Sequence, residues 1–217
     1  MSRPLYRAAR PGVCLRGLYA ITDSDIAAGA ALADKVAQVL AGGAAVIQYR
    51  DKGNDAARRA AEARQLLSLC RRYNVPLIIN DDVALALAVG ADGVHLGRED
   101  LALSEARRLL GRQSIIGISC YNALECALAA QQAGADYVAF GRFFPSVTKP
   151  SAAQANIETL IQARQQLHIP IVAIGGITPE NAPRLIAAGA DMIAAVQGVF
   201  GQADPQTAAQ GYAQLFK

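Results

Sequence analysis

Three features of the chain predict a single α/β domain folded as a (β/α)8 TIM barrel. The 217 residues, 53% of them apolar, are enough to bury one sizeable core. Short apolar runs alternate with longer amphipathic stretches, which is typical of repeated strand–helix units around a parallel sheet. A Gly-Ala signature also recurs just before every second apolar run, as expected when each repeat holds two such units.

The apolar runs are predicted to be eight parallel strands. They are almost free of charge, as strands covered on both faces should be. In chain order they are Gly17–Thr22, Ala45–Arg50, Leu77–Asn80, Gly93–Leu96, Ile115–Cys120, Tyr137–Gly141, Ile171–Gly175 and Met192–Gln197. Eight units in about 200 residues favour a small closed barrel. The alternative is an open, flavodoxin-like sheet.

The stretches between these runs place apolar residues at helical spacing, with charged or amide residues on the other side. The predicted helices, which would pack outside the sheet, are Asp34–Leu40, Arg58–Tyr73, Leu103–Leu110, Ala123–Ala133, Ile157–Leu167 and Glu180–Ala188. The glycines of the repeated signature, expected to cap helices in a left-handed conformation, are Gly43, Gly90, Gly134 and Gly189.

The composition indicates small-molecule partners. With 21 basic and 18 acidic residues the net charge is +3, and no basic stripe of the kind that nucleic acid requires is present. The sequence leaves open whether the chain forms a homo-oligomer.

The first residues of the chain carry no targeting or membrane signal. Residues 1–16 have neither the continuous apolar stretch of a signal peptide nor the length of a membrane span. We therefore expect a partly disordered lead-in over 1–16, a catalytic barrel domain over 17–217 and no membrane partner. The cysteines, which show no metal-ligand spacing and are expected to be free thiols in a reducing cytoplasm, are Cys14, Cys70, Cys120 and Cys126.

Polar residues gather where the predicted strands end. In a barrel of this kind, catalytic residues belong at the carboxyl ends of the strands and in the loops that follow. Arg50, Lys52 and Lys149 stand at such ends, where guanidinium and ammonium groups can bind phosphate oxygens. A solvated loop charge is the alternative, and it is strongest for Lys52. The pattern predicts a site for a polyanion.

Carboxylates at the same ends indicate a metal. Asp81 and Asp100 offer oxygen ligands that suit Mg²⁺, which takes one or two carboxylates together with waters and substrate phosphate. Asp81 and Asp82 both stand where a helix should begin, and we assign Asp82 to the helix cap. Gly175-Gly176 and Gln197-Gly198 end the last two strands, where barrels frequently hold phosphate with backbone N–H groups.

The two histidines are interpreted differently. His168 lies in a polar turn before the seventh predicted strand, on the non-catalytic side, and is expected at the surface. His95 lies near the end of the fourth strand. We interpret it as a core histidine with a backbone partner, in preference to a group that supports the site.

Five short motifs, taken in order, resemble the thiamine-phosphate synthase family. They are Leu18-Tyr19-Ala20-Ile21-Thr22-Asp23, Gln48-x-Arg50-x-Lys52, Asn80-Asp81-Asp82, Gly93-Val94-His95-Leu96-Gly97 and Gly141-x-x-Phe144-Pro145-Ser146-x-Thr148-Lys149. Each motif is weak alone, but their order and their places at the strand ends make the resemblance specific over residues 17–205.

The resemblance implies a cytoplasmic, Mg²⁺-dependent transferase of thiamine biosynthesis. It would join a pyrimidine diphosphate to a thiazole phosphate, with or without a carboxyl group on the thiazole, and release pyrophosphate by a dissociative substitution. The implied pyrimidine diphosphate ligands are Gln48, Tyr49, Arg50, Asp51, Lys52, Asn80, Ser119 and Lys149. Of these, the implied catalytic residues are Arg50, Lys52, Ser119 and Lys149. The implied thiazole phosphate site is Ser146, Val147, Thr148, Gly176, Val196 and Gln197. The implied metal ligands are Asp81 and Asp100.

The chain departs from the family's pattern at a few positions. Arg98 and Arg142 stand where Gln and Pro are expected, and Gln197-Gly198 replaces the commoner Ser-Ala. The last change puts a side-chain role of Gln197 in doubt, whereas backbone contacts to phosphate would survive it.

Two other functions compete with this interpretation. A related thiazole tautomerase would use the same barrel as an acid–base isomerase, without needing two metal-binding aspartates. A non-catalytic phosphate sensor could keep Gly175-Gly176 and dispense with Asp81, Asp100 and Lys149.

Overall fold

The structure, a computed structural model, describes residues 13–145 and 154–217, and within these residues eight parallel strands form a closed barrel. The strands are β1 Gly17–Ile21, β2 Ala44–Tyr49, β3 Leu77–Asn80, β4 Gly93–Leu96, β5 Ile115–Tyr121, β6 Tyr137–Gly141, β7 Ile171–Ile174 and β8 Met192–Ala195. Each pairs with the next along the chain. β8 returns to β1, with Gly17 opposite Met192 and Ala20 opposite Ala195. This last pairing confirms the predicted barrel and excludes the open flavodoxin-like sheet.

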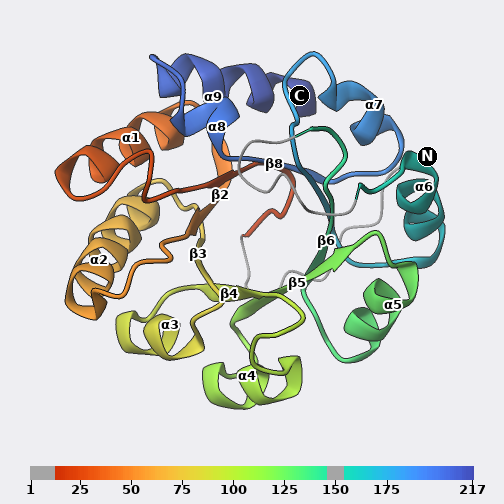
Figure 1. The fold of residues 1–217 in the computed structure, drawn as a ribbon, viewed down its shortest axis with the longest axis horizontal. Coiled ribbons are helices and arrows are strands. Elements are labelled where there is room, and N and C mark those ends of the chain that lie inside the picture. The colour runs from red at the N-terminus through yellow and green to blue at the C-terminus, as the bar shows by residue number, and fades with distance from the viewer. Residues whose placement is uncertain (1–12, 146–153) are drawn as a thin grey trace.

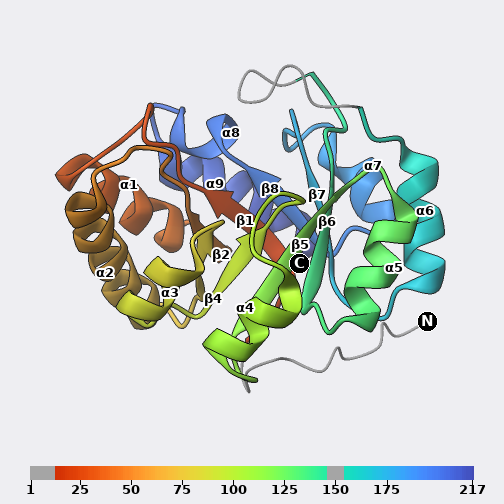
Figure 2. The same cartoon turned by 60° about the horizontal axis from the view of Figure 1, so that its bottom comes forward.

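The helices surround the barrel (Figure 1). They are α1 Ala30–Ala41, α2 Ala56–Arg72, α3 Val83–Val89, α4 Leu103–Leu110, α5 Leu124–Gln132, α6 Ile157–Gln166, α7 Ala182–Ala187, α8 Gln197–Phe200 and α9 Pro205–Ala213, followed by a short 3-10 turn, η1 Gln214–Phe216. Figure 2 shows α1 and α2 on one flank and α5 and α6 on the other, with the strands between them. None of these helices is long and apolar enough to cross a membrane.

The six predicted helices are confirmed with small shifts at their ends, but three helices were not predicted. α3 has the sequence Val-Ala-Leu-Ala-Leu-Ala-Val, which lacks the polar side that an amphipathic pattern needs.

The eighth strand was predicted to run to Gln197, whereas β8 ends at Ala195 and Gln197 begins α8. The four glycines of the repeated signature all have positive φ, and Gly90 caps α3 with φ 70°.

Alternating side chains divide the core into two shells. On β1, Leu18 and Ala20 pack in the cluster between barrel and helices, whereas Tyr19 and Ile21 belong to the cluster inside the barrel. Such alternation follows from the two-residue period of a strand. The inner cluster is completed by Val46, Ile78, Ile115, Tyr137, Ala139, Val172, Met192 and Ala194.

The described end of the predicted lead-in contacts this inner shell. Val13 and Leu15 pack against the cluster inside the barrel, and the Arg16 guanidinium donates a hydrogen bond to the Phe216 carbonyl at 2.7 Å. The start of the described chain therefore contacts the C-terminal turn η1. The four cysteines are free, as predicted, with Cys70 and Cys120 buried.

Candidate active site

A cleft of about 420 Å³ opens at the carboxyl ends of β2, β3 and β4. It brings together Lys52 from the loop after β2, Asn80 from the end of β3 and Asp81 from the turn that follows. These three residues were predicted from two strand ends. They meet because the strands are parallel and consecutive in the barrel.

Arg59, in the first turns of α2, also lines the cleft, and no motif had marked it. Its guanidinium donates to the Asp82 carboxylate at 2.9 Å. Its Nε is buried without a hydrogen-bond partner among the described residues. Arg59 lies one turn after the N-cap of α2, and nothing at such a position in the sequence indicates a residue that lines a cleft. The packing of α2 against the loop after β3 is what turns Arg59 toward the cleft.

Asp81 and Asp82 are neighbours with different tasks. Asp81 has φ 64°, a left-handed conformation that is uncommon outside glycine, and its N–H donates to the His95 carbonyl at 2.8 Å. This turn directs its carboxylate to the ammonium of Lys52. The Asp82 carboxylate instead accepts from the Leu85 N–H at 2.8 Å and caps α3, as predicted.

Asp100 lies close enough to Asp81 for each carboxyl group to shift the pKa of the other. Burial alone would raise the pKa of Asp81, but the hydrogen bond and charge of Lys52 outweigh it and hold that pKa below its usual value. Burial raises the pKa of Asp100, and the neighbouring Asp81 carboxylate raises it further, against the opposing hydrogen bond from the Gly97 N–H at 2.7 Å. Two adjacent carboxylates thus share a site that attracts a cation.

The donor set suits Mg²⁺. Two carboxylates are close together, and Asp81 already pairs with a cationic group. In the part of the chain that the structure describes, no three His, Cys, Asp or Glu side chains converge into a metal cage. Mg²⁺ prefers to complete its shell with waters and substrate phosphate, so a pair of carboxylates fits it.

The strand-end segment Gln48–Lys52 places its side chains in different environments. The Arg50 guanidinium lies 3.3 Å from the Asp23 carboxylate. Gln48 is buried inside the barrel and donates to the Tyr19 hydroxyl at 2.9 Å.

Tyr49 and Asp51 point toward α2. The Tyr49 hydroxyl donates to Glu62 at 2.7 Å, and the Asp51 carboxylate pairs with Arg58 at 2.6 Å. A contact from Tyr49 to a substrate would therefore come from its backbone.

His95 is buried in the core, as expected, but both of its ring nitrogens contact side-chain hydroxyls. A backbone partner was expected, yet its Nδ1 lies 3.0 Å from the Tyr137 hydroxyl and its Nε2 lies 2.8 Å from the Ser119 hydroxyl. His95 therefore contacts Ser119, a predicted substrate ligand. His168 is exposed, as predicted.

The predicted thiazole phosphate residues lie at the ends of β7 and β8. Gly176 has φ 61°, and a Cβ atom there would collide with the Pro145 carbonyl, so this position requires glycine. Val196 stands just before α8, and Gln197 is exposed. The remaining predicted residues, which lie outside the described residues, are Ser146, Val147, Thr148 and Lys149.

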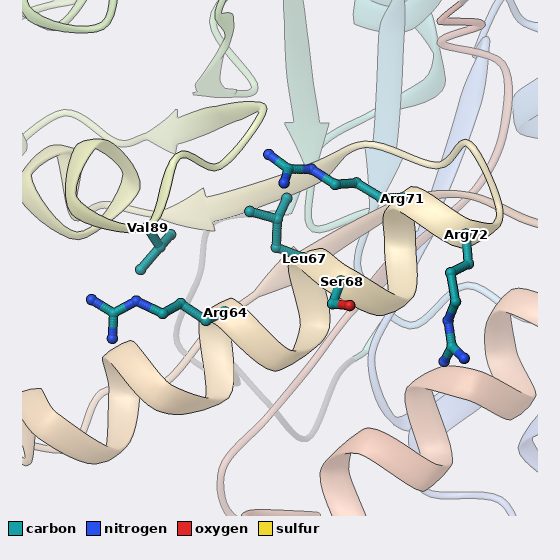
Figure 3. A pocket seen from close by; sticks show the side chains of 6 residues that line it. All are labelled: Arg64, Leu67, Ser68, Arg71, Arg72 and Val89. Atoms are coloured by element: carbon teal, nitrogen blue, oxygen red, sulfur yellow. The ribbon is translucent and has the colours of Figure 1, made fainter.

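A second hollow of about 500 Å³ lies on the outer surface, between α2 and α3. It is lined by Arg64, Leu67, Ser68, Arg71, Arg72 and Val89. Figure 3 shows that the Arg71 and Arg72 side chains point away from each other and that Arg64 points in a third direction, beside Val89. These cations do not converge on one anion. The cleft at the strand ends is therefore the better candidate for chemistry.

Comparisons with known proteins give one consistent result. The family model described as thiamine monophosphate synthase matches residues 18–199. A thiamine-phosphate synthase of Nitrosococcus oceani is 54% identical over 93% of this chain and 93% of its own length. That of Thioalkalivibrio sulfidiphilus is 52% identical over 95% and 98%. Among solved structures, thiamine phosphate pyrophosphorylase from Pyrococcus furiosus superposes with a TM-score of 0.85 at 35% identity, over 93% of this chain and 96% of that one.

Proposed function

This chain belongs to the thiamine monophosphate synthase family of transferases, and from this premise we propose that its strand-end cleft performs an Mg²⁺-dependent synthesis of thiamine phosphate. The substrates are a pyrimidine diphosphate and a thiazole phosphate, and the second product is pyrophosphate. The four free cysteines fit a cytoplasmic location for the enzyme.

One observation carries the proposal. Lys52, Asn80 and Asp81 come from consecutive strand ends and line one cleft. A cation, an amide and a carboxylate in one cleft match a ligand that is a polyanion accompanied by a divalent cation. The neighbouring carboxylate of Asp100 strengthens this match.

The reaction transfers a pyrimidine methylene group. The thiazole nitrogen forms a bond to the methylene carbon, and the bond from that carbon to the diphosphate oxygen breaks, its electron pair leaving with pyrophosphate. We propose a dissociative order, in which a pyrimidine-stabilised cation forms first. No protein nucleophile is needed. The protein has to stabilise the negative charge that develops on the departing diphosphate.

The cations of the cleft would bind that charge. Lys52 after β2 and Arg59 on α2 line the cleft, and Arg50 precedes the cleft-lining residue Asp51 in the chain. The resemblance to the family adds Lys149. Each well-placed donor or fixed charge can contribute roughly 3–4 kcal/mol to such a transition state. Mg²⁺ held by Asp81 and Asp100 would neutralise part of the diphosphate charge.

The thiazole phosphate would lie at the ends of β7 and β8. Gly176, Val196 and Gln197 would offer backbone N–H groups there without requiring a side-chain contact. Because the exposed side chain of Gln197 is not needed for such contacts, its departure from the commoner Ser is compatible with this role.

The test is a product balance. The purified chain is mixed with both substrates and Mg²⁺, and thiamine phosphate and pyrophosphate are measured together. We expect equal amounts of the two products. Thiazole isomerisation without pyrophosphate would identify a tautomerase, and binding without turnover would identify a sensor. Asp34→Asn, a change of the same kind on the exposed side of α1, is the matched control for Asp81→Asn and Asp100→Asn in this assay.

A further inference from the structure

Five side chains form a continuous hydrogen-bonded row across the inside of the barrel. Gln48 Nε2 donates to the Tyr19 hydroxyl at 2.9 Å, and the Tyr19 and Tyr137 hydroxyls are 2.7 Å apart. The Tyr137 hydroxyl lies 3.0 Å from His95 Nδ1, and His95 Nε2 lies 2.8 Å from Ser119 Oγ. The row begins and ends at predicted substrate ligands and crosses from β2 to β5.

The amide donor at the Gln48 end of this row favours one order of the hydrogens. Because Gln48 already donates to the Tyr19 oxygen, the Tyr19 hydrogen is available for Tyr137. The Tyr137 hydrogen then goes to Nδ1 of His95, and in a neutral imidazole the hydrogen must therefore sit on Nε2. In the reverse order the Tyr19 hydrogen would need another acceptor. The described contacts of that hydroxyl offer none beyond Gln48 and Tyr137.

We propose that His95 is a positioning residue that, as the Nε2–H tautomer, donates to Ser119 and so turns the Ser119 hydroxyl into a hydrogen-bond donor toward the departing diphosphate. This inference rests on the proposed function. Ser119 Oγ accepts from His95, which leaves its own hydrogen for an acceptor in the mouth of the barrel. A donor aimed at an oxygen that gains negative charge acts most strongly in the transition state.

Packing holds the row in one geometry. The rings of His95 and Tyr137 are stacked with centroids 5.6 Å apart, and Tyr19 meets Tyr137 edge-on at 5.8 Å. A Cβ atom at Gly117 would collide with the Tyr137 ring, so glycine is needed beneath it. Burial also raises the pKa of both tyrosines well above the usual value of 10.0, so both hydroxyls keep the hydrogens that the order requires.

The tautomer can be observed directly in the protein without substrate. The full chain, labelled with the heavy nitrogen isotope in histidine, is studied by two-bond nitrogen–proton NMR correlation. The chain has two histidines, so a His168→Asn variant assigns the signals. We expect His95 to carry its hydrogen on Nε2. A hydrogen on Nδ1, or on both nitrogens, would overturn the proposed order.

Kinetics then test the consequence. In His95→Gln the side-chain NH2 group can occupy the position of Nε2 and still donate to Ser119. The shorter side chain in His95→Asn cannot reach that position. We expect His95→Asn to lower kcat about ten-fold with little change in the KM for the pyrimidine diphosphate, and His95→Gln to recover most of that loss. Equal losses in the two variants, or a loss confined to KM, would contradict the role.

The effect of His95 should also depend on Ser119. Adding Ser119→Ala to His95→Asn should cause no further loss, because both changes remove the same donor. Additive losses would show that His95 acts by another route. Thermal unfolding of each variant separates misfolding from these effects. If NMR finds the Nε2–H tautomer but the wild-type chain makes no thiamine phosphate, the proposed function fails and the hydrogen-bond order stands.

Discussion

At the scale of single residues, the backbone decides which of two adjacent aspartates is available for chemistry. Asp81 has φ 64° and faces Lys52, while Asp82 is in an extended conformation and caps α3. The left-handed conformation of Asp81 is uncommon for a residue with a side chain, and such conformations often occur at functional sites. Identical side chains therefore acquire different roles through one dihedral angle.

We predict that Asp81→Asn and Asp100→Asn each raise the Mg²⁺ concentration needed for half-maximal activity at least about ten-fold. An amide keeps the shape of the carboxylate but removes the charge that holds a hard cation. Magnesium titrations of steady-state activity measure the effect, with Asp34→Asn as the control. Titration curves that match the parent's for both variants would show that the ligands are elsewhere.

At the scale of elements, buried polar pairs hold the loops in place. After β2, the Asp51 carboxylate accepts from the Gly53 N–H at 2.7 Å and pairs with Arg58 of α2. Glu62 on the next turn of α2 accepts from the Tyr49 hydroxyl and from the Gly29 N–H at 2.8 Å. This network fixes the loop from which Lys52 reaches the cleft.

The Asp51 pair predicts an acid-dependent loss of stability. Burial alone would raise the pKa of Asp51, but the hydrogen bond from Gly53 and the charge of Arg58 outweigh it and lower that pKa. A folded-state pKa below the unfolded value gives stability that is present above pH 3.8 and lost as the pH falls through the folded pKa. Asp51→Asn should lower the unfolding free energy at neutral pH by about 1–3 kcal/mol.

Urea unfolding of the parent and Asp51→Asn at several pH values would measure this effect. The difference between the two proteins should shrink as the acid range is approached. A difference that stays constant down to the lowest pH at which the chain folds would contradict the charge-based explanation.

The contact between α8 and α9 leaves no room for a side chain at Gly198, where the resemblance to the family led us to expect alanine. A Cβ atom at Gly198 would collide with the hydroxyl of Tyr212, which is fully buried and donates to the Ile177 carbonyl at 2.8 Å. We predict that Gly198→Ala costs about 1–3 kcal/mol of unfolding free energy through overpacking. In a Tyr212→Phe background the same change should cost almost nothing. Denaturant unfolding of the four proteins in this cycle tests the coupling, and equal costs in both backgrounds would refute it.

At the scale of the whole molecule, closure of the sheet encloses an inner cluster that is separate from the cluster between the barrel and the helices. Ile78 is completely buried in the inner cluster, between strands that are tied to one another around the full barrel. The surrounding strands cannot easily move inward to fill the cavity that a shorter side chain would leave. The cost of a cavity is largest where the surroundings cannot relax.

We therefore predict that Ile78→Ala lowers the unfolding free energy by about 4–5 kcal/mol, at the upper end for such a change. Leu87→Ala is the control, because Leu87 on α3 is 57% exposed and should change stability by less than about 0.5 kcal/mol. Chemical denaturation followed by circular dichroism compares the two. Similar small effects for both would show that the inner shell relaxes freely.

The sequence by itself determined the eight strands, most of the helices and the strand ends whose polar residues line the cleft. Apolar runs such as Tyr137–Gly141 can be recognised because strands buried on both faces exclude charge along their whole length. The sequence also distinguished the expected roles of Asp81 and Asp82, because a helix that begins after β3 needs an N-cap residue. These are local properties, expressed within a few neighbouring residues.

Only the tertiary structure decided the features that depend on residues far apart in the chain. The pairing of β1 with β8 made the sheet a barrel, and the packing of α2 brought Arg59 into the cleft. The hydrogen-bonded row from Gln48 to Ser119 joins side chains from β2, β1, β6, β4 and β5. Nothing in the sequence indicates that these side chains contact one another. A hydrogen bond depends on the distance and direction between two groups in space, and a linear pattern of residues contains neither.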